Sequence, residues 1–463
     1  MQGRQKISYE SYPKDVVVQP QDNLGAQSIP SAQTKTNSCE ERRYQLLEEI
    51  LAKENMMAAL KRVEANKGAP GVDSMEVSEL RGYLRQEWPH IKSSLLDGTY
   101  RPMPVRRAKI PKPDHGMRDL GIPNAVDRMT QQAIAQVIGP IFEEEFSRYS
   151  YGFRPGRKPR DAVLAAKEYI EQGYRWVVDI DIERFFDRVN HDMLMAKVAA
   201  KVKDKRVLKL IRSYLTSGVM ISGVVIDTDE GTPQGGPLSP LLSNIMLDEL
   251  DKELERRGHR FCRYADDCNI YLKSKRAAER VYGSMREFIE AKLKLKVNQD
   301  KSAVDRVWRR KFLGFSYYTS SKREVRLRLA PEVVRRQKDM IRKITKRSRG
   351  ISVDKVIAEI NQKMMGFINY FKIADMKEFL MRLQEWIRRK LRVIVWKHWK
   401  RMRTKFRKLI GMGLSLEQTK IIVYSRKKYW RLSNTPQLNK VMGIAFFEGL
   451  GLMNLVERYN LIR

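Results

Sequence analysis

The sequence predicts an α+β fold followed by a helical unit. Strand-like apolar stretches at residues 174–182, 219–228, 260–274 and 311–320 are separated by stretches with helical periodicity. Strands and helices in this order favour a sheet with helices packed on one face. Beyond Ala330 the strand-like segments stop, and basic amphipathic helices follow. These observations divide the chain into a mixed part and an all-helical part.

Composition limits the class of protein. The chain has 463 residues, 42% of them hydrophobic, which is enough for several globular units. Its 90 Lys and Arg against 55 Asp and Glu give a net charge of +35, which favours a polyanionic partner. Nucleic acid is the first candidate and an anionic membrane surface the second. No apolar stretch reaches the length of a membrane span, and three cysteines favour a reducing compartment, so we expect a cytoplasmic protein.

The N-terminal hundred residues are predicted to hold a flexible leader and then helices. Residues 1–40 are rich in Gln, Ser, Pro and Thr and show little apolar periodicity. Residues 41–66 carry apolar residues at helical spacing and end at the breaker "KGAPGVDS". A second helical stretch follows within 41–100. Residues 101–127 alternate short apolar elements with Pro, Gly and cations, which indicates strands and loops that expose positive charge.

The middle of the chain alternates helices, basic loops and strands. "RMTQQAIAQVIGPIFEEEF" predicts a helix, and "YSYGFRPGRKPRDAVLAAKEYIEQG" predicts a basic loop that leads into another helix. "YRWVVDIDI" is apolar and β-branched, as is typical of a buried strand. We place the mixed part at residues 101–330, a helical part at 331–410 and a last small unit at 411–463.

Two groups of aspartates are the candidate catalytic residues. Asp179 and Asp181 alternate along a predicted strand and so share one face, while the predicted hairpin "RYADDCNIY" carries Asp266 and Asp267. Alone, each group has an ordinary explanation, since Asp is common in turns and at strand ends. Together they predict convergent carboxylates, which are unfavourable unless a cation compensates them. Hard oxygen ligands select Mg²⁺, and two such ions promote phosphoryl or nucleotidyl transfer.

With these residues in view, the chain resembles reverse transcriptases encoded by bacterial group II introns, of the compact kind without an endonuclease domain. The resemblance covers residues 45–463 and rests on motifs in the family's order: "KGAPGVDS", "IPKPDHGMRDLGIP", "YGFRPGR", "DIDIERFFDRVNHD", "EGTPQGGPLSPLLSN", "RYADD", "LKLKVNQDKS" and "FLGFSY". It implies a right-hand polymerase. Fingers and a palm with an antiparallel sheet would occupy 101–330, a helical thumb or maturase domain 331–410, and a small DNA-binding-like domain 411–463.

The resemblance also implies a catalytic role for particular residues. Asp181 and Asp266 would hold two Mg²⁺ ions, with Asp267 assisting and the Ile182 carbonyl completing one metal site. Asp181 is preferred because it meets the family's D-x-x-x-x-F-D spacing. Phe186 would be a steric gate beneath the sugar that favours dNTPs, although a core Phe is the alternative.

Further residues are implied to bind the nucleotide. Lys112 and Arg118 match triphosphate-binding cations, Gln234 would lie near the incoming nucleotide, and Lys301 could protonate pyrophosphate. The alternatives are solvated surface cations for the three basic residues and a plain Gly/Pro turn for "TPQGGPLSP". "FLGFSY" resembles the family's primer grip, but a core strand is equally consistent with it.

The stretch from Trp386 to Lys408 contains eleven Lys or Arg and no acidic residue. Its interleaved tryptophans predict a helix with an apolar stripe inward and a cationic stripe outward. The resemblance makes this stretch the part that grips template, primer and intron RNA. The implied nucleic-acid-binding residues are Arg388, Arg389, Lys390, Lys397, Lys400, Arg401 and Arg403.

Two classes of function follow from these patterns. In the first, the protein copies an RNA template into DNA from a DNA or RNA primer with dNTPs, and it promotes splicing of its group II intron RNA and insertion into a DNA target. In the second, it is a splicing-only RNA-binding protein on an inactive polymerase fold; a domesticated relative in defence or repair is a further alternative. The five histidines are scattered, so we expect no endonuclease metal cluster. The oligomeric state is left open.

Overall fold

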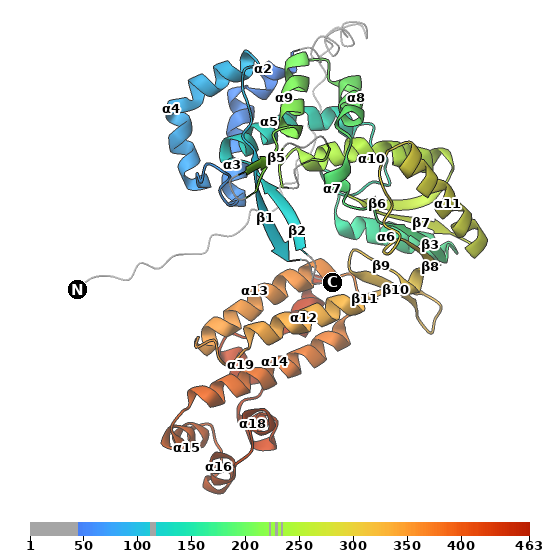
Figure 1. The fold of residues 1–463 in the computed structure, drawn as a ribbon. Coiled ribbons are helices and arrows are strands. Elements are labelled where there is room, and N and C mark those ends of the chain that lie inside the picture. The colour runs from blue at the N-terminus through green and yellow to red at the C-terminus, as the bar shows by residue number, and fades with distance from the viewer. Residues whose placement is uncertain (1–44, 112–116, 222–223, 227–229, 233–234) are drawn as a thin grey trace, which may run out of the picture.

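The computed structural model describes residues 45–111, 117–221, 224–226, 230–232 and 235–463. The early helices and a long hairpin lie together at the top in Figure 1, the main sheet lies beside them, and an elongated helical part extends below. This arrangement confirms the predicted α+β fold with a helical unit after it. Lys112 and Gln234 lie outside the described residues, as does the side chain of Arg118.

The fingers combine helices with a four-stranded sheet of order β2-β1-β4-β5. Their elements are α2 (Leu46–Ile50), α3 (Lys53–Asn66), α4 (Val77–Leu96), β1 (Val105–Pro111), β2 (Met117–Ile122), α5 (Ala125–Glu143), β4 (Val219–Ile221) and β5 (Val224–Ile226). β1 and β2 are antiparallel and form the hairpin that points toward the helical part in Figure 1. The predicted strands of residues 101–127 are therefore present, and the loop between them, residues 112–116, lies outside the described residues.

The first predicted helix is interrupted. Instead of continuing to Asn66, it ends as α2 and restarts as α3, with Leu51 and Ala52 between them. The Asn55 side-chain amide donates to the Ile50 carbonyl at 2.8 Å. This bond satisfies a carbonyl that the broken helix leaves open, so the apolar periodicity continues across a break in the backbone.

The palm sheet has the order β6-β7-β3-β8, and each neighbouring pair is antiparallel. The elements of this part are α6 (Pro159–Glu171), β3 (Trp176–Ile180), α7 (Phe185–Arg188), α8 (His191–Lys201), α9 (Lys205–Leu215), α10 (Ser239–Arg256), β6 (Arg260–Tyr264), β7 (Asp267–Leu272), α11 (Lys275–Ala291), β8 (Ala303–Arg306) and the 3₁₀ turn η1 (Val307–Arg309). The central strand β3 lies between β7 and β8.

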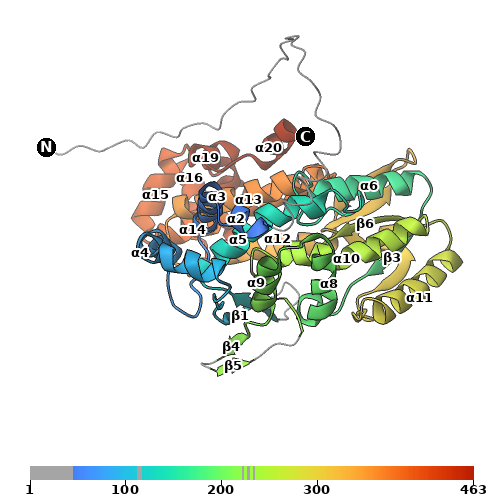
Figure 2. The same cartoon turned by 90° about the horizontal axis from the view of Figure 1, so that it is seen from above.

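Helices cover both faces of the palm sheet, so the expectation of one covered face is wrong. Val178 and Ile270 pack into a core shared with α10 and α11. Val177 and Tyr271, on the opposite face, pack into a second core with α6. Figure 2 shows α6 and α11 on either side of the strands. The cause is visible in the sequence, since "WVVDI" has apolar residues on both faces and not in strict alternation.

Three short strands connect the palm to the helical part. They form a separate sheet of order β11-β10-β9, made of β9 (Lys311–Phe312), β10 (Phe315–Thr319) and β11 (Val325–Leu329). The helices that follow are α12 (Pro331–Ile344), α13 (Val353–Phe371), α14 (Lys377–His398), α15 (Met402–Gly411), α16 (Leu416–Val423), α17 (Tyr429–Leu432), α18 (Pro436–Val441), α19 (Ile444–Gly449) and α20 (Leu455–Ile462). Across the described stretches of the chain, no helix is both long and apolar enough to traverse a bilayer.

Candidate active site

The palm register brings two distant aspartates to the same end of the sheet. β3 pairs with β7 through Asp179 with Asn269 and Ile180 with Cys268. Extending this antiparallel register by one pair places Asp181 across from Asp267. Asp266 is the second residue of the two-residue turn between β6 and β7. The segments that carry the aspartates are thus neighbours in space.

A cavity of about 570 Å³ opens at this end of the sheet. Asp179, Asp181 and Asp267 line it together with Lys301, one of the predicted nucleotide-binding residues. The turn of the "FLGFSY" motif forms another wall through residues 312–314. Asp266 is half-buried in the hairpin turn beside this cavity and is not among the residues that line it. One cavity therefore joins Asp181 and Asp267 to the predicted primer grip.

Asp267 carries the clearest electrostatic perturbation of the site. Burial by the surrounding atoms and then the carboxylates of Asp266, Asp179 and Asp181 raise the pKa of Asp267 to about 7, while Lys301 opposes them. Its side chain still has exposed surface on the cavity side. Like charges held this close favour a proton or a cation between them. The donor set is therefore suited to a hard divalent ion.

Asp179 has a partner of its own. The Arg310 guanidinium donates to the Asp179 carboxylate at 2.6 and 3.0 Å. Burial raises the pKa of Asp179, and Arg310 counters that effect. The same guanidinium donates to the Lys301 carbonyl at 2.8 Å. Asp179 therefore anchors the "NQDKS" loop through Arg310, a contact that sequence spacing alone could not distinguish from metal binding.

The backbone of Asp181 is fixed by the loop after α11. The Asn298 N–H donates to the Asp181 carbonyl at 2.9 Å, and the Asp181 N–H donates to the Ser302 hydroxyl at 3.0 Å. Ile182 is buried and forms an isolated antiparallel bridge with Val297. That bridge uses the groups of the flanking residues, so it does not engage the Ile182 carbonyl. This leaves the carbonyl compatible with the implied role.

Phe186 lies on the short helix α7 next to the loop "EGTPQGG". Its ring meets the buried Phe185 ring edge-on at 5.3 Å, and it is itself only half-buried. Its carbonyl accepts from the Thr232 N–H at 2.6 Å. Gly231 at φ +96° passes so close that a Cβ there would lie 2.8 Å from the Phe186 carbonyl oxygen. Gly231 and Thr232, which precede Gln234 in the chain, are thus packed against the backbone of Phe186, the candidate steric gate.

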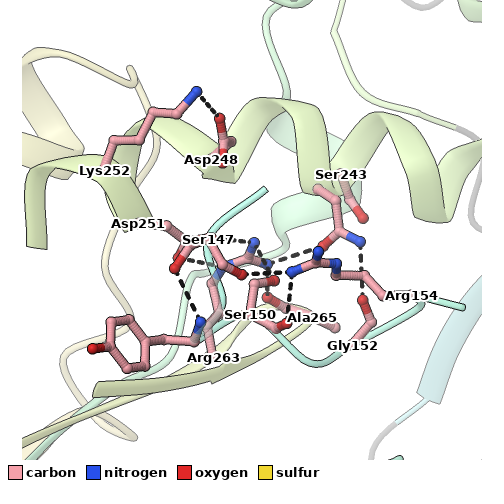
Figure 3. Close-up of polar contacts among 12 residues, drawn as sticks. Ser147, Ser150, Gly152, Arg154, Ser243, Asp248, Asp251, Lys252, Arg263 and Ala265 are labelled. Carbon is pink, nitrogen blue, oxygen red and sulfur yellow. Dashed lines mark hydrogen bonds and ion pairs between the residues drawn. The ribbon is translucent and has the colours of Figure 1, made fainter. Parts of the chain in front are cut away.

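A buried arginine holds the hairpin that carries Asp266 and Asp267. Arg263 is fully buried and donates to both carboxylate oxygens of Asp251 on α10, at 2.6 and 2.7 Å (Figure 3). It also donates to the Asn244 side chain, the Ser150 hydroxyl and the Ala265 carbonyl at 3.1, 2.8 and 2.9 Å. Ala265 is the first turn residue and has φ +58°, a conformation that costs energy in a residue other than Gly. The arginine therefore fixes a strained turn.

The "YGFRPGR" motif encloses the same turn from outside. Arg154 is buried and donates to the carbonyls of Ser147 and Ser150 at 2.5 and 3.0 Å. The Gly152 carbonyl accepts from Asn244 at 2.9 Å. A Cβ on Gly152 would lie 2.2 Å from the Ala265 nitrogen, so only glycine permits this approach. Neither Arg263 nor Gly152 was singled out from the sequence, although Asp251 on the apolar stripe of α10 was a usable signal.

The predicted cations of the fingers and thumb are only partly described. The backbone of Arg118 pairs with Ile110 in the β1–β2 hairpin. In α14, Arg388, Arg389 and Lys390 are half-buried, and Lys397 near the helix end is exposed. Exposed cations after the helix are Lys400, Arg401 and Arg403. The predicted nucleic-acid-binding residues thus separate into a half-buried group and an exposed group.

The residues present suit a divalent ion chemically. Among the residues that the structure describes, no three His, Cys, Asp or Glu side chains lie close enough together to hold a metal ion as they stand. Asp181 and Asp267 nevertheless line one cavity, and burial followed by the neighbouring carboxylates raises the pKa of Asp267. Oxygen donors of this kind are those that Mg²⁺ takes.

Two family models match the chain. "Reverse transcriptase (RNA-dependent DNA polymerase)" matches residues 110–317, and "Group II intron, maturase-specific domain" matches residues 334–410. The first match includes every aspartate of the cavity described above. The second covers α14, with its cations.

Individual proteins are also similar to this chain in sequence. Protein YkfC of Escherichia coli is 33% identical over 306 residues, which are 57% of this chain and 80% of that protein. The group II intron-encoded protein LtrA of Lactococcus lactis is 30% identical over 386 residues, 69% of this chain and 62% of LtrA. A solved "Partial Cas6-RT-Cas1--Cas2 complex" is 28% identical over 53% of this chain and 42% of that one, with a TM-score of 0.36.

Proposed function

The chain belongs to the reverse transcriptases, in the branch that carries the group II intron maturase domain, and on that premise we propose that its palm aspartates catalyse RNA-directed DNA synthesis. The single observation that carries the proposal is the cavity shared by Asp181, Asp267 and the turn at residues 312–314. Members of the family generally use divalent metal ions. The pKa of Asp267, raised to about 7, supports a cation at this cavity.

Each residue has a defined part in this proposal. Asp181, Asp266 and Asp267 would hold two Mg²⁺ ions together with the Ile182 carbonyl. Bound ions of this kind activate the primer 3′-hydroxyl and neutralise the leaving pyrophosphate. Lys301, exposed at the same cavity, would donate a proton to pyrophosphate.

The incoming dNTP would lie between the palm and the β1–β2 hairpin. Lys112 and Arg118 would bind its triphosphate, Gln234 would lie beside its base, and Phe186 would exclude a 2′-hydroxyl. The Arg107 and Asp119 side chains form an ion pair on that hairpin. Asp187, on the palm helix α7 of Phe186, raises the pKa of Arg107, as Asp119 does more strongly. This coupling supports a hairpin that faces the palm.

The proposed partners are an RNA template with a DNA or RNA primer, group II intron RNA and a DNA target. LtrA is named as a group II intron-encoded protein, and the matched maturase domain supports splicing and mobility for this chain. Both similar proteins above come from bacteria, so we place the activity in the bacterial cytoplasm.

Primer extension on an RNA template with dNTPs tests the proposal. The double variant Asp266→Ala/Asp267→Ala should lose extension by about a hundredfold or more. Asp300→Asn is the matched control, because Asp300 is exposed in the same cavity and should keep near wild-type activity. Extension that survives the double variant would refute the catalytic assignment.

Splicing separates the two classes of function. If intron binding depends on the basic surface, the Asp266→Ala/Asp267→Ala protein should still promote splicing of its intron RNA. Wild-type protein that promotes splicing but extends no primer would favour the splicing-only alternative. A gene without flanking group II intron sequence would favour a domesticated enzyme in defence or repair.

The steric gate is tested separately. Phe186→Ala should raise the incorporation of ribonucleotides relative to deoxyribonucleotides by about tenfold or more, because it removes the ring from beneath the sugar. Phe185→Ala is the comparison, since Phe185 is buried in the core and its loss should lower stability without changing sugar selection. Equal sugar selection by wild type and Phe186→Ala would contradict the assignment.

A further inference from the structure

A second cavity, far along the helical part, is lined by positive charge. It has a volume of about 460 Å³, within the roughly 300–1,000 Å³ of ligand pockets. α14 forms one wall through Arg382, Glu385, Trp386, Arg388, Arg389 and Arg392, and the stretch from Asn434 to Ile444 forms the other. Four arginines and one glutamate thus line the cavity.

Three of the four arginines of this cavity have no acidic partner at ion-pair distance. Arg382 pairs with Glu378 on the outer surface of α14. Among the residues that the structure describes, no carboxylate lies within ion-pair distance of Arg388, Arg389 or Arg392. Glu385 lines the same cavity and, with Glu448, acts on Arg388 without pairing with it. Positive charge therefore remains in excess, which is unfavourable, so the cavity favours an anion.

Arg392 shows this most clearly. It is 7% exposed and donates to two backbone carbonyls, those of Ser433 at 2.7 Å and Met442 at 3.1 Å. Burial, followed by the charges of Arg388 and Arg389, lowers the pKa of Arg392 to about 10. The sequence led us to expect an outward cationic stripe, whereas this arginine lies inside, held by the chain beyond α17.

Two contacts fix the orientation of the Arg389 guanidinium, and one of its hydrogen-bond donors has no acceptor. Its guanidinium lies 3.8 Å from the centre of the Trp430 ring and donates to the Trp430 carbonyl at 3.1 Å. The Nε atom of Arg389 is buried and has no hydrogen-bond partner. A buried donor without an acceptor costs energy, and the other nitrogens of this guanidinium belong to a residue that lines the cavity.

The polar lining opposite the arginines gives the cavity two chemically different sides. Asn434 and Asn439 supply amide donors and acceptors, and Ile444 supplies apolar surface. This combination fits one nucleotide, with its phosphate toward the guanidiniums and its base toward the amides. A base within a duplex could not enter a concave site of this size, whereas an unpaired base can.

We propose that this cavity, between α14 and the stretch 434–444, binds one unpaired nucleotide of an RNA strand by its phosphate and base. The proposal rests on the proposed function in taking RNA as the polymer that the protein binds. It adds a discrete site, distinct from the exposed cations Lys400, Arg401 and Arg403, which would attract any phosphate backbone.

Binding of a labelled single-stranded RNA tests the proposal with variants of equal charge. Arg388→Gln/Arg389→Gln should weaken binding at least tenfold, because it removes the phosphate donors of the cavity. Lys400→Gln/Arg401→Gln removes the same charge from the exposed surface and should weaken binding only two- to threefold. Asn439→Leu changes the base side without changing charge and should also weaken binding.

Neutral methylphosphonate links, placed singly along the RNA, locate the site. In wild type and in Lys400→Gln/Arg401→Gln, a neutral link at one position should lower the affinity much more than a link at any other position. In Arg388→Gln/Arg389→Gln, a link at that position should lower the affinity no more than the others do. No outstanding position, or equal losses for the two charge-matched variants, would overturn the proposal. The same pattern with a DNA strand would overturn its assignment to RNA.

Primer extension on a short template keeps the two proposals apart. Asn439→Leu, which keeps every cation of α14, should retain extension at saturating template. Wild-type protein without extension would contradict the proposed function and leave the binding comparison intact. Wild-type extension together with equal binding by the two charge-matched variants would contradict the nucleotide site alone.

Discussion

The buried pair between Arg263 and Asp251 leads to a prediction about stability and activity together. Both side chains are at most 1% exposed. Burial raises the pKa of the Asp251 carboxyl, and Arg263 opposes that effect. Replacing Arg263 by Met leaves a buried carboxylate without its two charged donors. The expected loss in the free energy of unfolding is about 3–5 kcal/mol, typical when one partner of a buried pair is removed.

The double variant Arg263→Met/Asp251→Leu removes both charges. Apolar replacements of a buried pair are often neutral or stabilising, so this protein should recover most of the stability that Arg263→Met loses. It still lacks the donor to the Ala265 carbonyl, which lies 2.9 Å from Arg263 in the native protein. Because a displacement of about 1 Å can cost about a hundredfold in rate, we expect primer extension to fall tenfold to a hundredfold.

Urea unfolding followed by fluorescence measures the stability, and steady-state primer extension measures the activity. An unchanged KM for dNTP with a lowered kcat would indicate that the hairpin is mispositioned and that the protein is not simply less folded. A double variant that is stable and fully active would refute the positioning argument. A cost below about 1 kcal/mol for Arg263→Met would refute the energetic one.

Two further predictions concern the fingers and the turn. Gly152→Ala should lower the free energy of unfolding by about 1–3 kcal/mol and reduce extension, because its Cβ would lie 2.2 Å from the Ala265 nitrogen; Gly283→Ala on α11, where a Cβ meets nothing within 4 Å, should be neutral or stabilising. Burial raises the pKa of Asp127 to about 6. The Tyr100 hydroxyl, which donates to the Asp127 carboxylate at 2.7 Å, opposes this shift. The folded protein thus holds a proton that the unfolded chain releases near pH 4, and wild type should lose roughly 2 kcal/mol relative to Asp127→Asn between pH 4 and 6. Unfolding curves that keep a constant difference over this range would contradict that assignment.

Sequence patterns were sufficient for much of the palm. The alternation of Asp179 and Asp181 and the hairpin "RYADD" predict that these aspartates converge at one end of the sheet, as the β3–β7 register places them. Local turn chemistry and strand period decide such features. The spacing could not show that Asp179 pairs with Arg310, because that contact joins residues 131 positions apart.

Other features depend on tertiary packing. The break between α2 and α3 depends on Asn55 reaching the Ile50 carbonyl, and apolar periodicity does not report such a bond. The inward position of Arg392 depends on carbonyls 41 and 50 residues further along. Charge runs predict an outward stripe by default, and only the fold reveals which cation is turned inward.

Divalent-ion binding at the palm aspartates tests the account's central claim most directly. Titration of Mn²⁺, followed by its electron paramagnetic resonance signal with primer–template and dNTP bound to a chain-terminated primer, should report two bound ions in wild type and in Asp300→Asn. Asp181→Asn/Asp267→Asn should lose at least one of them. Equal Mn²⁺ binding by all three proteins would contradict the assignment of these carboxylates.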